Sequence, residues 1–224
     1  IGAGTTTTGV QGVNLAGAAG NSLTVNGTLR NTAGTTPYTV LAGGPFTLTL
    51  GTAGTIVGPL AFTTGNDTFN NQGTFALPAA LDFLTGTDVL NNSGTLTAFN
   101  GTSSIANLET FNNVGGLIDM RDGAANDIVN LGNANYVGSA GARLGLDIGG
   151  SAGGLTSDRL VLGGNASGST ALNLNFLAGS AIVDQDGVLI VDAGTATGTP
   201  FAIGGQSSFG LINFGLRQTG GDTF

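Results

Sequence analysis

A short motif that recurs every 21 residues places the strongest constraint on the fold of this 224-residue chain. Asn70-Asn71-Gln72-Gly73-Thr74-Phe75 recurs as Asn91-Asn92-Ser93-Gly94-Thr95-Leu96 and again as Asn112-Asn113-Val114-Gly115-Gly116-Leu117. A fixed period of this size indicates units that stack on one another. The unit is too short for a propeller blade and lacks the pattern of a leucine-rich repeat. It fits one coil of a right-handed parallel β-helix, with three short strands and three turns per coil.

In such a fold each repeated position becomes a column of equivalent side chains, spaced about 4.8 Å along the axis. Phe69, Leu90 and Phe111 are predicted to form an inward apolar column. Phe75, Leu96 and Leu117 are predicted to form a second one. Asn70, Asn91 and Asn112 are predicted to stack their amides, each bonded to the next coil. The column Gly73, Gly94 and Gly115 is predicted to supply a positive φ at a corner.

The repeat weakens on both sides of these copies. Asn133-Ala134-Asn135-Tyr136 resembles a degraded fourth copy, and Asn26-Gly27-Thr28-Leu29 resembles the motif without a clean register. Beyond residue 130 the chain has longer strand-like segments, including residues 171–176 and 187–191. We predict β-helix coils over residues 1–129, and the last coils with a C-terminal β-hairpin cap over residues 130–224. Both ends of the chain suggest a piece of a longer protein.

The composition favours an ordered, all-β fold. Glycine supplies 42 residues, and glycine and the β-branched threonine are both poor helix formers. Hydrophobic residues make up 40% and the mean hydropathy is +0.28, which argues against disorder. No apolar run is long enough for a membrane-spanning helix, and no signal-peptide pattern opens the chain.

The residue types that are missing exclude several classes of function. Without histidine there is no Ser–His–Asp machinery and no imidazole metal site. Without cysteine there is no disulfide, thiolate zinc site or redox pair, and the chain could cross a periplasm without being locked by disulfides. Five basic residues against a net charge of −8 argue against a nucleic-acid partner.

An acidic column, Asp67, Asp88 and Glu109, precedes the repeated asparagines. A calcium ion would offset these stacked charges, and the surrounding sequence echoes part of a calcium-binding nonapeptide repeat. The tandem glycines and nine-residue spacing of that repeat are absent. We therefore prefer the interpretation that the side chains tighten a turn in solvent. Asp184-Gln185-Asp186-Gly187 is likewise interpreted as a turn, and no metal or other cofactor is predicted.

Residues 119–127 carry the one local cluster with catalytic potential. Asp119, Arg121, Asp122 and Asp127 resemble the acids and cation of polysaccharide lyases and glycosidases on β-helices. The simpler interpretation is a polar turn in which Arg121 pairs with a neighbouring aspartate. Ser157-Asp158-Arg159 lacks a nearby general base, so we predict that it forms hydrogen bonds between coils. No catalytic residue is predicted, and the chain is expected not to be an enzyme.

The Asn-Asn-x-Gly-Thr coils, followed by Thr156-Ser157-Asp158-Arg159-Leu160-Val161 and Asp186-Gly187-Val188-Leu189-Ile190-Val191, resemble the pertactin-like passenger region of bacterial autotransporters, which are type V secretion proteins. The resemblance implies a rigid adhesin stalk at the bacterial cell surface. It also implies a C-terminal autochaperone region that promotes folding and secretion. The implied partners are the protein's own outer-membrane barrel and a host or neighbouring-cell surface or matrix, with self-association as a further expectation. Arg121-Asp122-Gly123 is not the integrin-binding Arg-Gly-Asp, so no binding residue carries over.

Two alternatives remain open from the sequence. A self-assembling surface-layer or matrix protein has a similar acidic, cysteine-free composition rich in threonine and glycine. A polysaccharide-active β-helix enzyme would depend on Asp122. Calcium-dependent sheets or filaments would favour the first alternative, and loss of activity in Asp122→Asn would favour the second.

Overall fold

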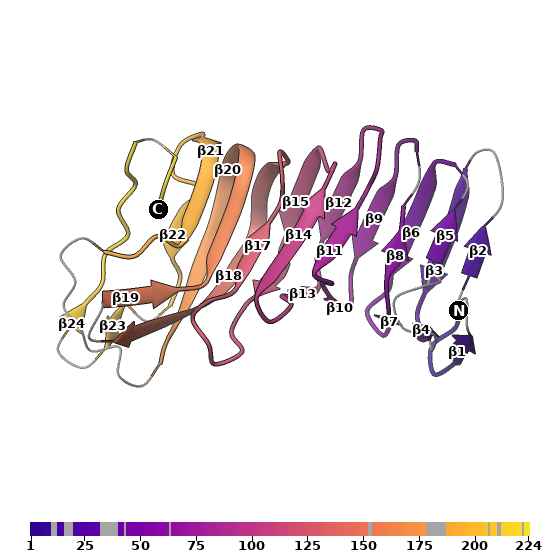
Figure 1. The fold of residues 1–224 in the computed structure, drawn as a ribbon, viewed down its shortest axis with the longest axis horizontal. Coiled ribbons are helices and arrows are strands. Elements are labelled where there is room, and N and C mark those ends of the chain that lie inside the picture. The colour runs from indigo at the N-terminus through magenta and orange to yellow at the C-terminus, as the bar shows by residue number, and fades with distance from the viewer. Residues whose placement is uncertain are drawn as a thin grey trace.

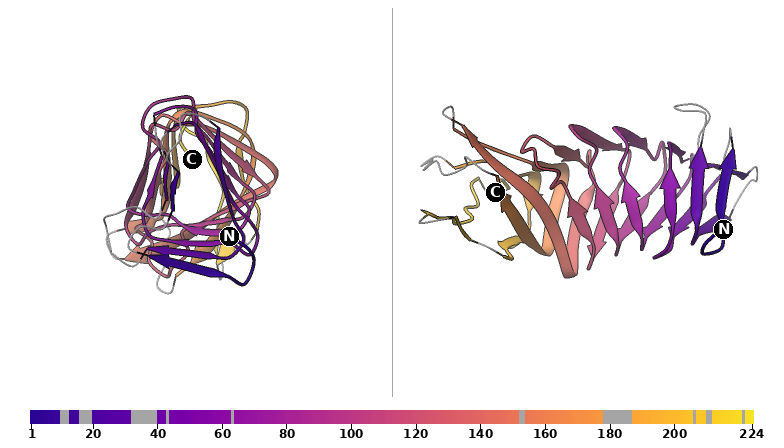
Figure 2. Two further views of the ribbon diagram at one scale, coloured as in Figure 1. Left: turned by 90° about the vertical axis from the view of Figure 1, so that its right-hand side faces the viewer. Right: turned by 90° about the horizontal axis from the view of Figure 1, so that it is seen from below.

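The computed structural model describes residues 1–9, 13–15, 20–31, 40–42, 44–62, 64–151, 154–177, 187–205, 207–209, 212–220 and 222–224. Within these ranges the chain contains strands and no helix. The strands stack in parallel as a β-helix of about six turns, which confirms the predicted fold class. Seen along its axis the coil has a three-sided cross-section, and seen from the side it is elongated (Figures 1 and 2).

Each side of the coil is a ladder of short parallel strands. The first face consists of β3 (Asn21–Val25), β6 (Phe46–Leu50), β9 (Thr68–Asn71), β12 (Val89–Asn92) and β15 (Thr110–Val114). The second face consists of β1 (Thr6–Gly9), β4 (Thr28–Asn31), β7 (Thr55–Val57), β10 (Thr74–Ala76), β13 (Thr95–Thr97) and β16 (Leu117–Asp119). The third face consists of β2 (Val13–Leu15), β5 (Val40–Ala42), β8 (Leu60–Ala61), β11 (Ala80–Asp82), β14 (Thr102–Ala106) and β17 (Ile128–Asn130).

Longer strands continue these ladders towards the C-terminus (Figure 1). They are β18 (Asn135–Ser151), β19 (Gly154–Ser157), β20 (Arg159–Phe176), β21 (Val191–Ala196) and β22 (Phe201–Ile203), followed by the small antiparallel pair β23 (Ser208–Phe209) and β24 (Ile212–Asn213). β18 pairs first with β15 and then with β16, and so passes around a corner from the first face to the second. Its far end forms an antiparallel hairpin with β19.

The register confirms the first predicted apolar column. Phe69 pairs with Leu90, which pairs with Phe111, and all three side chains are fully buried. The alternation of buried and partly exposed residues along β9 and β12 follows from the two-residue period of a strand. One face of each strand therefore supplies the core and the other supplies the surface.

The second apolar column differs from the prediction at its last member. Phe75 pairs with Leu96, but Leu96 pairs with Ile118, and Leu117 lies instead beside Thr95. The step from Thr95 to Leu117 is 22 residues because one residue is inserted in the turn after Asn113. Since side chains alternate along a strand, this insertion moves Leu117 out of the core and Ile118 into it.

The degraded fourth copy was also placed wrongly by the 21-residue period. Tyr136 pairs with Phe111, and Val137 rather than Asn133 pairs with Asn112. This coil is 25 residues long, because a longer turn over residues 120–127 precedes β17. The apolar column itself is preserved, since Tyr136 is fully buried and stacks on Phe111 with ring centroids 5.7 Å apart.

The repeated glycines mark a place where successive backbones come close, and the predicted positive φ is wrong for two of them. Gly73 and Gly94 have no positive φ. Glycine is needed at Gly94 for space instead, because a Cβ there would lie 2.1 Å from the carbonyl oxygen of Gly73. Gly115 does have a φ of +73°, but the inserted residue puts Gly116 beside Gly94 in the register. A Cβ on Gly116 would lie 2.6 Å from the carbonyl oxygen of Asn92.

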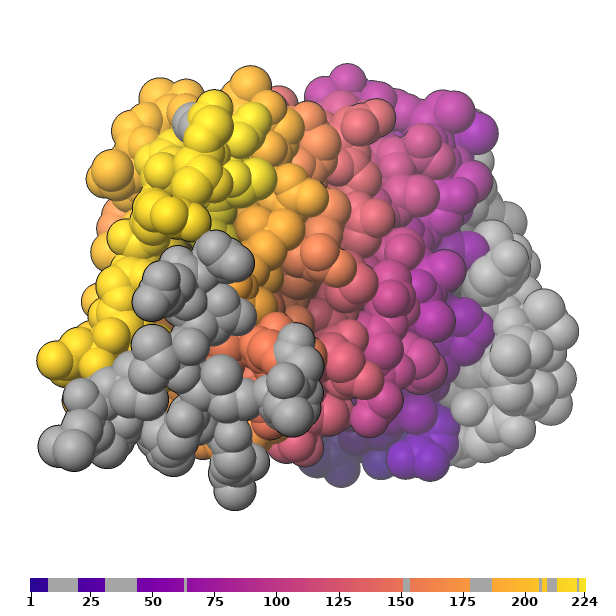
Figure 3. Space-filling model, turned by 60° about the vertical axis from the view of Figure 1, so that its left-hand side comes forward, coloured from indigo at the N-terminus to yellow at the C-terminus, as the bar shows by residue number. Residues whose placement is uncertain are grey.

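The C-terminal residues lie over the end of the coil stack (Figure 3). Phe224 is buried, and its ring meets Phe201 edge-on with centroids 5.2 Å apart. Its backbone exchanges hydrogen bonds with Val191 at 2.9 and 3.0 Å. The predicted strand over residues 187–191 is found only at its last residue, where β21 begins, while residues 171–176 belong to β20 as predicted.

Candidate functional site

An outer asparagine ladder runs along the first face, as predicted. The side-chain amide of Asn91 donates to Asn70 Oδ1 at 2.9 Å, and that of Asn112 donates to Asn91 Oδ1 at 2.9 Å. These side chains are half-buried and face outward from β9, β12 and β15. Each coil is thereby joined to the next by side-chain as well as backbone hydrogen bonds.

A second asparagine ladder lies inside the core and was not predicted. Asn71 donates to Asn92 Oδ1 at 2.8 Å, and Asn92 donates to Asn113 Oδ1 at 3.0 Å, with all three side chains fully buried. Asn113 in turn donates to the Tyr136 hydroxyl at 3.2 Å, which lies 2.8 Å from Thr170 Oγ1. The doubled Asn-Asn of the motif was the signal: in a strand, neighbouring residues point to opposite sides.

The acidic column of Asp67, Asp88 and Glu109 bonds to the backbone of the preceding coil. Asp67 Oδ1 accepts from the N–H of Phe46 at 2.8 Å, and Asp88 Oδ1 accepts from the N–H of Asp67 at 2.6 Å. Glu109 Oε2 accepts from the N–H of Asp88 at 2.6 Å. The predicted turn-tightening role is therefore found, but the solvent environment is not, because Asp67 and Asp88 are fully buried.

Burial has an electrostatic consequence at Asp88. Removal from water raises the pKa of its carboxyl to about 6, and the nearby charges of Asp67 and Glu109 act in the same direction. The backbone N–H of Asp67 opposes the shift. Among the described residues the second carboxylate oxygen, Oδ2, has no hydrogen-bond partner. The negative charge of Asp88 is therefore poorly supported by its surroundings.

Asp158 joins three parts of the chain at the base of the β18–β19 hairpin. Its Oδ1 accepts from the N–H of Asp127 at 2.9 Å and its Oδ2 from the N–H of Asp147 at 2.7 Å. The hydroxyl of the preceding Ser157 donates to the carbonyl oxygen of Leu189 at 2.7 Å. The predicted inter-coil role of this segment is confirmed. Burial raises the pKa of the Asp158 carboxyl to about 6 against its two backbone donors.

The candidate catalytic cluster at residues 119–127 forms a structured turn. Arg121 pairs with Asp119 through two hydrogen bonds of 2.6 and 3.1 Å, as the simpler interpretation predicted. Asp122 accepts from Asn100 and from the N–H of Ala124. Asp127 is buried and accepts from the N–H of Gly101 at 2.6 Å. Each carboxylate therefore has a structural partner.

Asp147 is the residue of this region that sequence reasoning missed. It is fully buried, and its Oδ2 accepts from the N–H of Gly123 at 2.7 Å, while its Oδ1 accepts from the Asn175 amide. It thereby ties the turn at residue 123 to β18 and β20. Nothing in the local sequence Gly145-Leu146-Asp147-Ile148 distinguishes it from an exposed strand residue.

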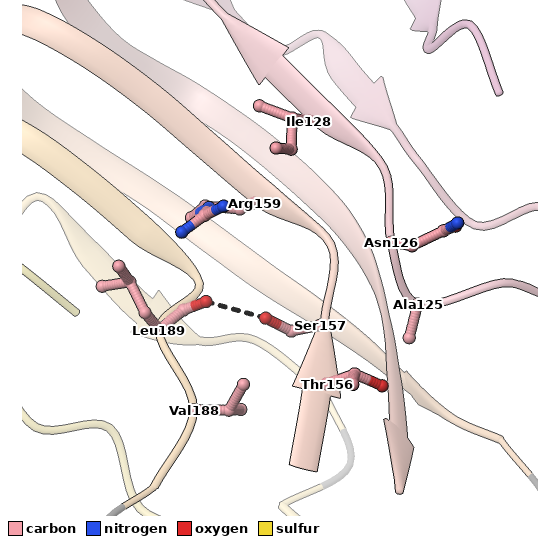
Figure 4. A pocket seen from close by; sticks show the side chains of 8 residues that line it. All are labelled: Ala125, Asn126, Ile128, Thr156, Ser157, Arg159, Val188 and Leu189. Carbon is pink, nitrogen blue, oxygen red and sulfur yellow. Dashed lines mark hydrogen bonds between the residues drawn. The ribbon is translucent and has the colours of Figure 1, made fainter. Parts of the chain in front are cut away.

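A pocket of about 280 Å³ opens beside the hairpin base (Figure 4). It is lined by Ala125, Asn126, Ile128, Thr156, Ser157, Arg159, Val188 and Leu189. The lining contains no carboxylate, and the Ser157 hydroxyl donates to Leu189, so the pocket supplies no pair of carboxylates for acid–base chemistry. The described residues contain no group of three or more acidic, histidine or cysteine side chains arranged to hold a metal ion. Of the turn predicted at Asp184-Gln185-Asp186-Gly187, residues 184–186 lie outside the described residues.

Comparison with known proteins does not assign the chain to a family. No protein-family model matches the sequence, and no curated protein matches it significantly. In the described part of the chain no helix is long and apolar enough to cross a membrane.

Proposed function

We propose that the chain is part of a non-catalytic passenger of a bacterial autotransporter, acting as a rigid surface stalk and adhesin whose C-terminal region promotes folding and secretion. In the full-length protein this stalk would be attached to the outer membrane through its own C-terminal barrel. The parallel β-helix is compatible with this role, and the resemblance of residues 156–161 to the family motif supports it.

The position of the Ser157-Asp158 segment carries the proposal. Its side chains contact the coil before it at Asp127, the hairpin at Asp147 and the coil after it at Leu189. A segment with these three partners fixes the register of the last coils. Once formed, it presents ordered strand edges on which preceding coils can pair, and each added coil buries another layer of apolar side chains.

The proposed absence of catalysis rests on the contacts of the acidic cluster at residues 119–127 and on the lining of the pocket. Asp119 pairs with Arg121, and Asp127 accepts a backbone N–H, so neither is held ready for proton transfer to a substrate. The pocket beside the hairpin lacks the carboxylate pair that glycoside hydrolysis needs.

Deletion of residues 150–224 tests the folding role. The shortened chain loses Asp158 and every strand from β19 to β24, so we expect a weaker β-sheet circular dichroism signal and faster digestion by protease than in the parent chain. Equal resistance of the two chains would contradict the folding role.

The gene itself tests the autotransporter assignment. We expect the reading frame to continue beyond the codon for Phe224 into an outer-membrane barrel of about 12 strands. A frame that lacks such a barrel would contradict the assignment. Calcium-dependent sheets or filaments of the purified protein would favour a surface-layer or matrix protein in its place.

A further inference from the structure

We propose that the outward side of the first face binds a neutral polysaccharide chain. Two outward columns cover this side from β3 to β21. The first column is Ser22, Thr47, Thr68, Val89, Thr110, Asn135, Asn165 and Thr195. The second column is Thr24, Thr49, Asn70, Asn91, Asn112, Val137 and Ser167. All of these side chains are exposed or half-buried.

The two columns contain no charged residue, although the whole chain carries 13 acidic and five basic residues. The second face, by contrast, presents Arg30, Asp119 and Arg143 at the surface. The carboxylates beside the first face all accept backbone N–H groups, with Asp67 and Asp88 buried and Glu109 half-buried. A charged partner would therefore lose hydration on this face without gaining an ion pair, which favours an uncharged partner.

Several polar groups of the face are free to bond outward, although Thr49, Asn165 and Thr195 also bond within the face. Among the described residues, the hydroxyls of Thr47, Thr68 and Thr110 have no hydrogen-bond partner in the protein. Each amide of the outer asparagine ladder uses one N–H along the ladder, as in Asn91 and Asn112, and keeps a second N–H. Hydroxyls and amides both donate and accept, and so do the hydroxyls of a sugar.

The spacing and rigidity of these groups suit an extended polymer. Neighbouring groups lie about 4.8 Å apart along the axis and roughly 6.6 Å apart along a strand. The β-branched threonines have a restricted χ1, and the asparagines are fixed by the ladder, so little side-chain entropy is lost on binding. The face holds no aromatic side chain, so it would contact the hydroxyl edges of sugars rather than their flat faces.

A second copy of the chain fits this face less well. Cores of stable protein interfaces are rich in aromatic and large apolar residues. Here the outward apolar side chains are Val89 and Val137 in the two columns and Val114 at the end of β15. A dimer through this face would bury many hydroxyls and amides with little apolar area to stabilise it.

The inference deepens the proposed adhesive role and rests on it. The test uses the purified 224-residue chain and its co-sedimentation with microcrystalline cellulose and chitin, which are neutral, and with pectate, which is anionic. We expect retention by at least one neutral polymer that persists at high salt, and no retention by pectate. Absence of binding to both neutral polymers, or binding to pectate only, would overturn the inference.

Paired lysine variants locate the binding surface. Thr68→Lys/Thr110→Lys places two charges on the first face, and Thr74→Lys/Thr97→Lys places the same two on exposed positions of the second face. We expect the first variant to bind at least about tenfold more weakly and the second to bind like the parent chain. Circular dichroism and thermal melts check that both are folded. Equal loss in the two variants would overturn the inference.

Sedimentation velocity tests the competing interpretation, in which a second copy of the chain occupies the first face. A parent chain that dimerises, with dimerisation abolished in Thr68→Lys/Thr110→Lys alone, would assign the face to a second copy and overturn the polysaccharide inference. Binding by the purified chain does not depend on secretion. A failure here is therefore distinct from a failure of the autotransporter assignment, which the gene sequence tests.

Discussion

Asn92 donates its side-chain amide to Asn113 Oδ1 across 3.0 Å in the interior of the β-helix. It also accepts a hydrogen bond from Asn71 and donates to the carbonyl oxygen of Leu117. A buried amide is stable in an apolar core only when its partners are present. The ladder supplies both an acceptor and a donor for the amide of Asn92, whereas Asn71 at the end of the ladder has a partner for its NH₂ only.

The position of an asparagine in the inner ladder should decide the cost of replacing it. Asn92→Leu leaves the buried Asn113 Oδ1 without its donor, so we expect the free energy of unfolding to fall by about 2–4 kcal/mol. Asn71 ends the ladder, and its Oδ1 already lacks a partner in the described structure. Asn71→Leu moves that unsatisfied acceptor to Asn92 and removes one hydrogen bond to the Thr95 carbonyl oxygen, so we expect a smaller loss of about 1 kcal/mol. Urea denaturation measures both, and equal losses would contradict the ladder.

Gly94 should be intolerant of a methyl group although its φ is ordinary. A Cβ there would lie 2.1 Å from the carbonyl oxygen of Gly73 and 2.6 Å from the carbonyl carbon of Gln72. Because these are backbone atoms, the coils must move apart, and we expect Gly94→Ala to cost about 2–3 kcal/mol. Gly215→Ala is the control, since it has open space, and should change stability by less than about 0.5 kcal/mol. Similar melting temperatures for the two variants would show that the coils do not approach so closely.

Mild acid should stabilise the fold through Asp88. Burial raises the folded-state pKa of this carboxyl to about 6, whereas the unfolded value is about 4. The folded state therefore binds more protons between these values, and stability falls as pH rises through about 6. We expect unfolding to cost about 1 kcal/mol more at pH near 4.5 than at pH near 7.5, after allowance for solvent screening.

Asp88→Asn isolates this contribution. The amide keeps an oxygen that can accept from the N–H of Asp67 and places its NH₂ where Oδ2 has no partner. We expect higher stability than the parent near neutral pH and a flatter dependence on pH, both measured by urea denaturation. A variant with the parent's pH dependence would assign the effect to other carboxyls.

Replacement by asparagine should lower stability at Asp158, unlike at Asp88, although burial raises the pKa of the Asp158 carboxyl to about 6 as well. Both of its oxygens accept backbone N–H groups, so the NH₂ of Asp158→Asn would face a donor. We expect a loss of about 2–4 kcal/mol. Ser157→Ala removes one hydrogen bond to Leu189 and should cost about 1 kcal/mol. A lower melting temperature for Ser157→Ala than for Asp158→Asn would contradict the proposed role of Asp158.

The parts of the fold that follow the 21-residue period were predictable from the sequence. Phe69, Leu90 and Phe111, like the outer asparagines, keep a strict 21-residue spacing, and the structure stacks them directly. The parts that depend on insertions were not. One extra residue displaced Leu117 in favour of Ile118, and the longer turn over residues 120–127 moved the fourth copy to Tyr136.

The buried carboxylates show a second limit. The sequence identified the column of Asp67 and Asp88 but placed it in solvent, because acidic residues are seldom fully buried. The structure buries them because each carboxylate accepts a backbone N–H at a corner of the coil. Such partners come from a residue one coil away and leave no local pattern. The same reason hides Asp147, whose donors are Gly123 and Asn175.

Cysteine pairs on the first face test the stacked register most directly, because the chain has no cysteine of its own. Thr68 and Val89 are register partners in adjacent coils, and the Cα separation of about 4.8 Å lies within the range that a disulfide spans. Thr68→Cys/Val89→Cys should form an intramolecular disulfide on mild oxidation. Thr68→Cys/Thr110→Cys, two coils apart, should stay reduced. A disulfide in the second pair, or none in the first, would contradict the stacking of 21-residue coils.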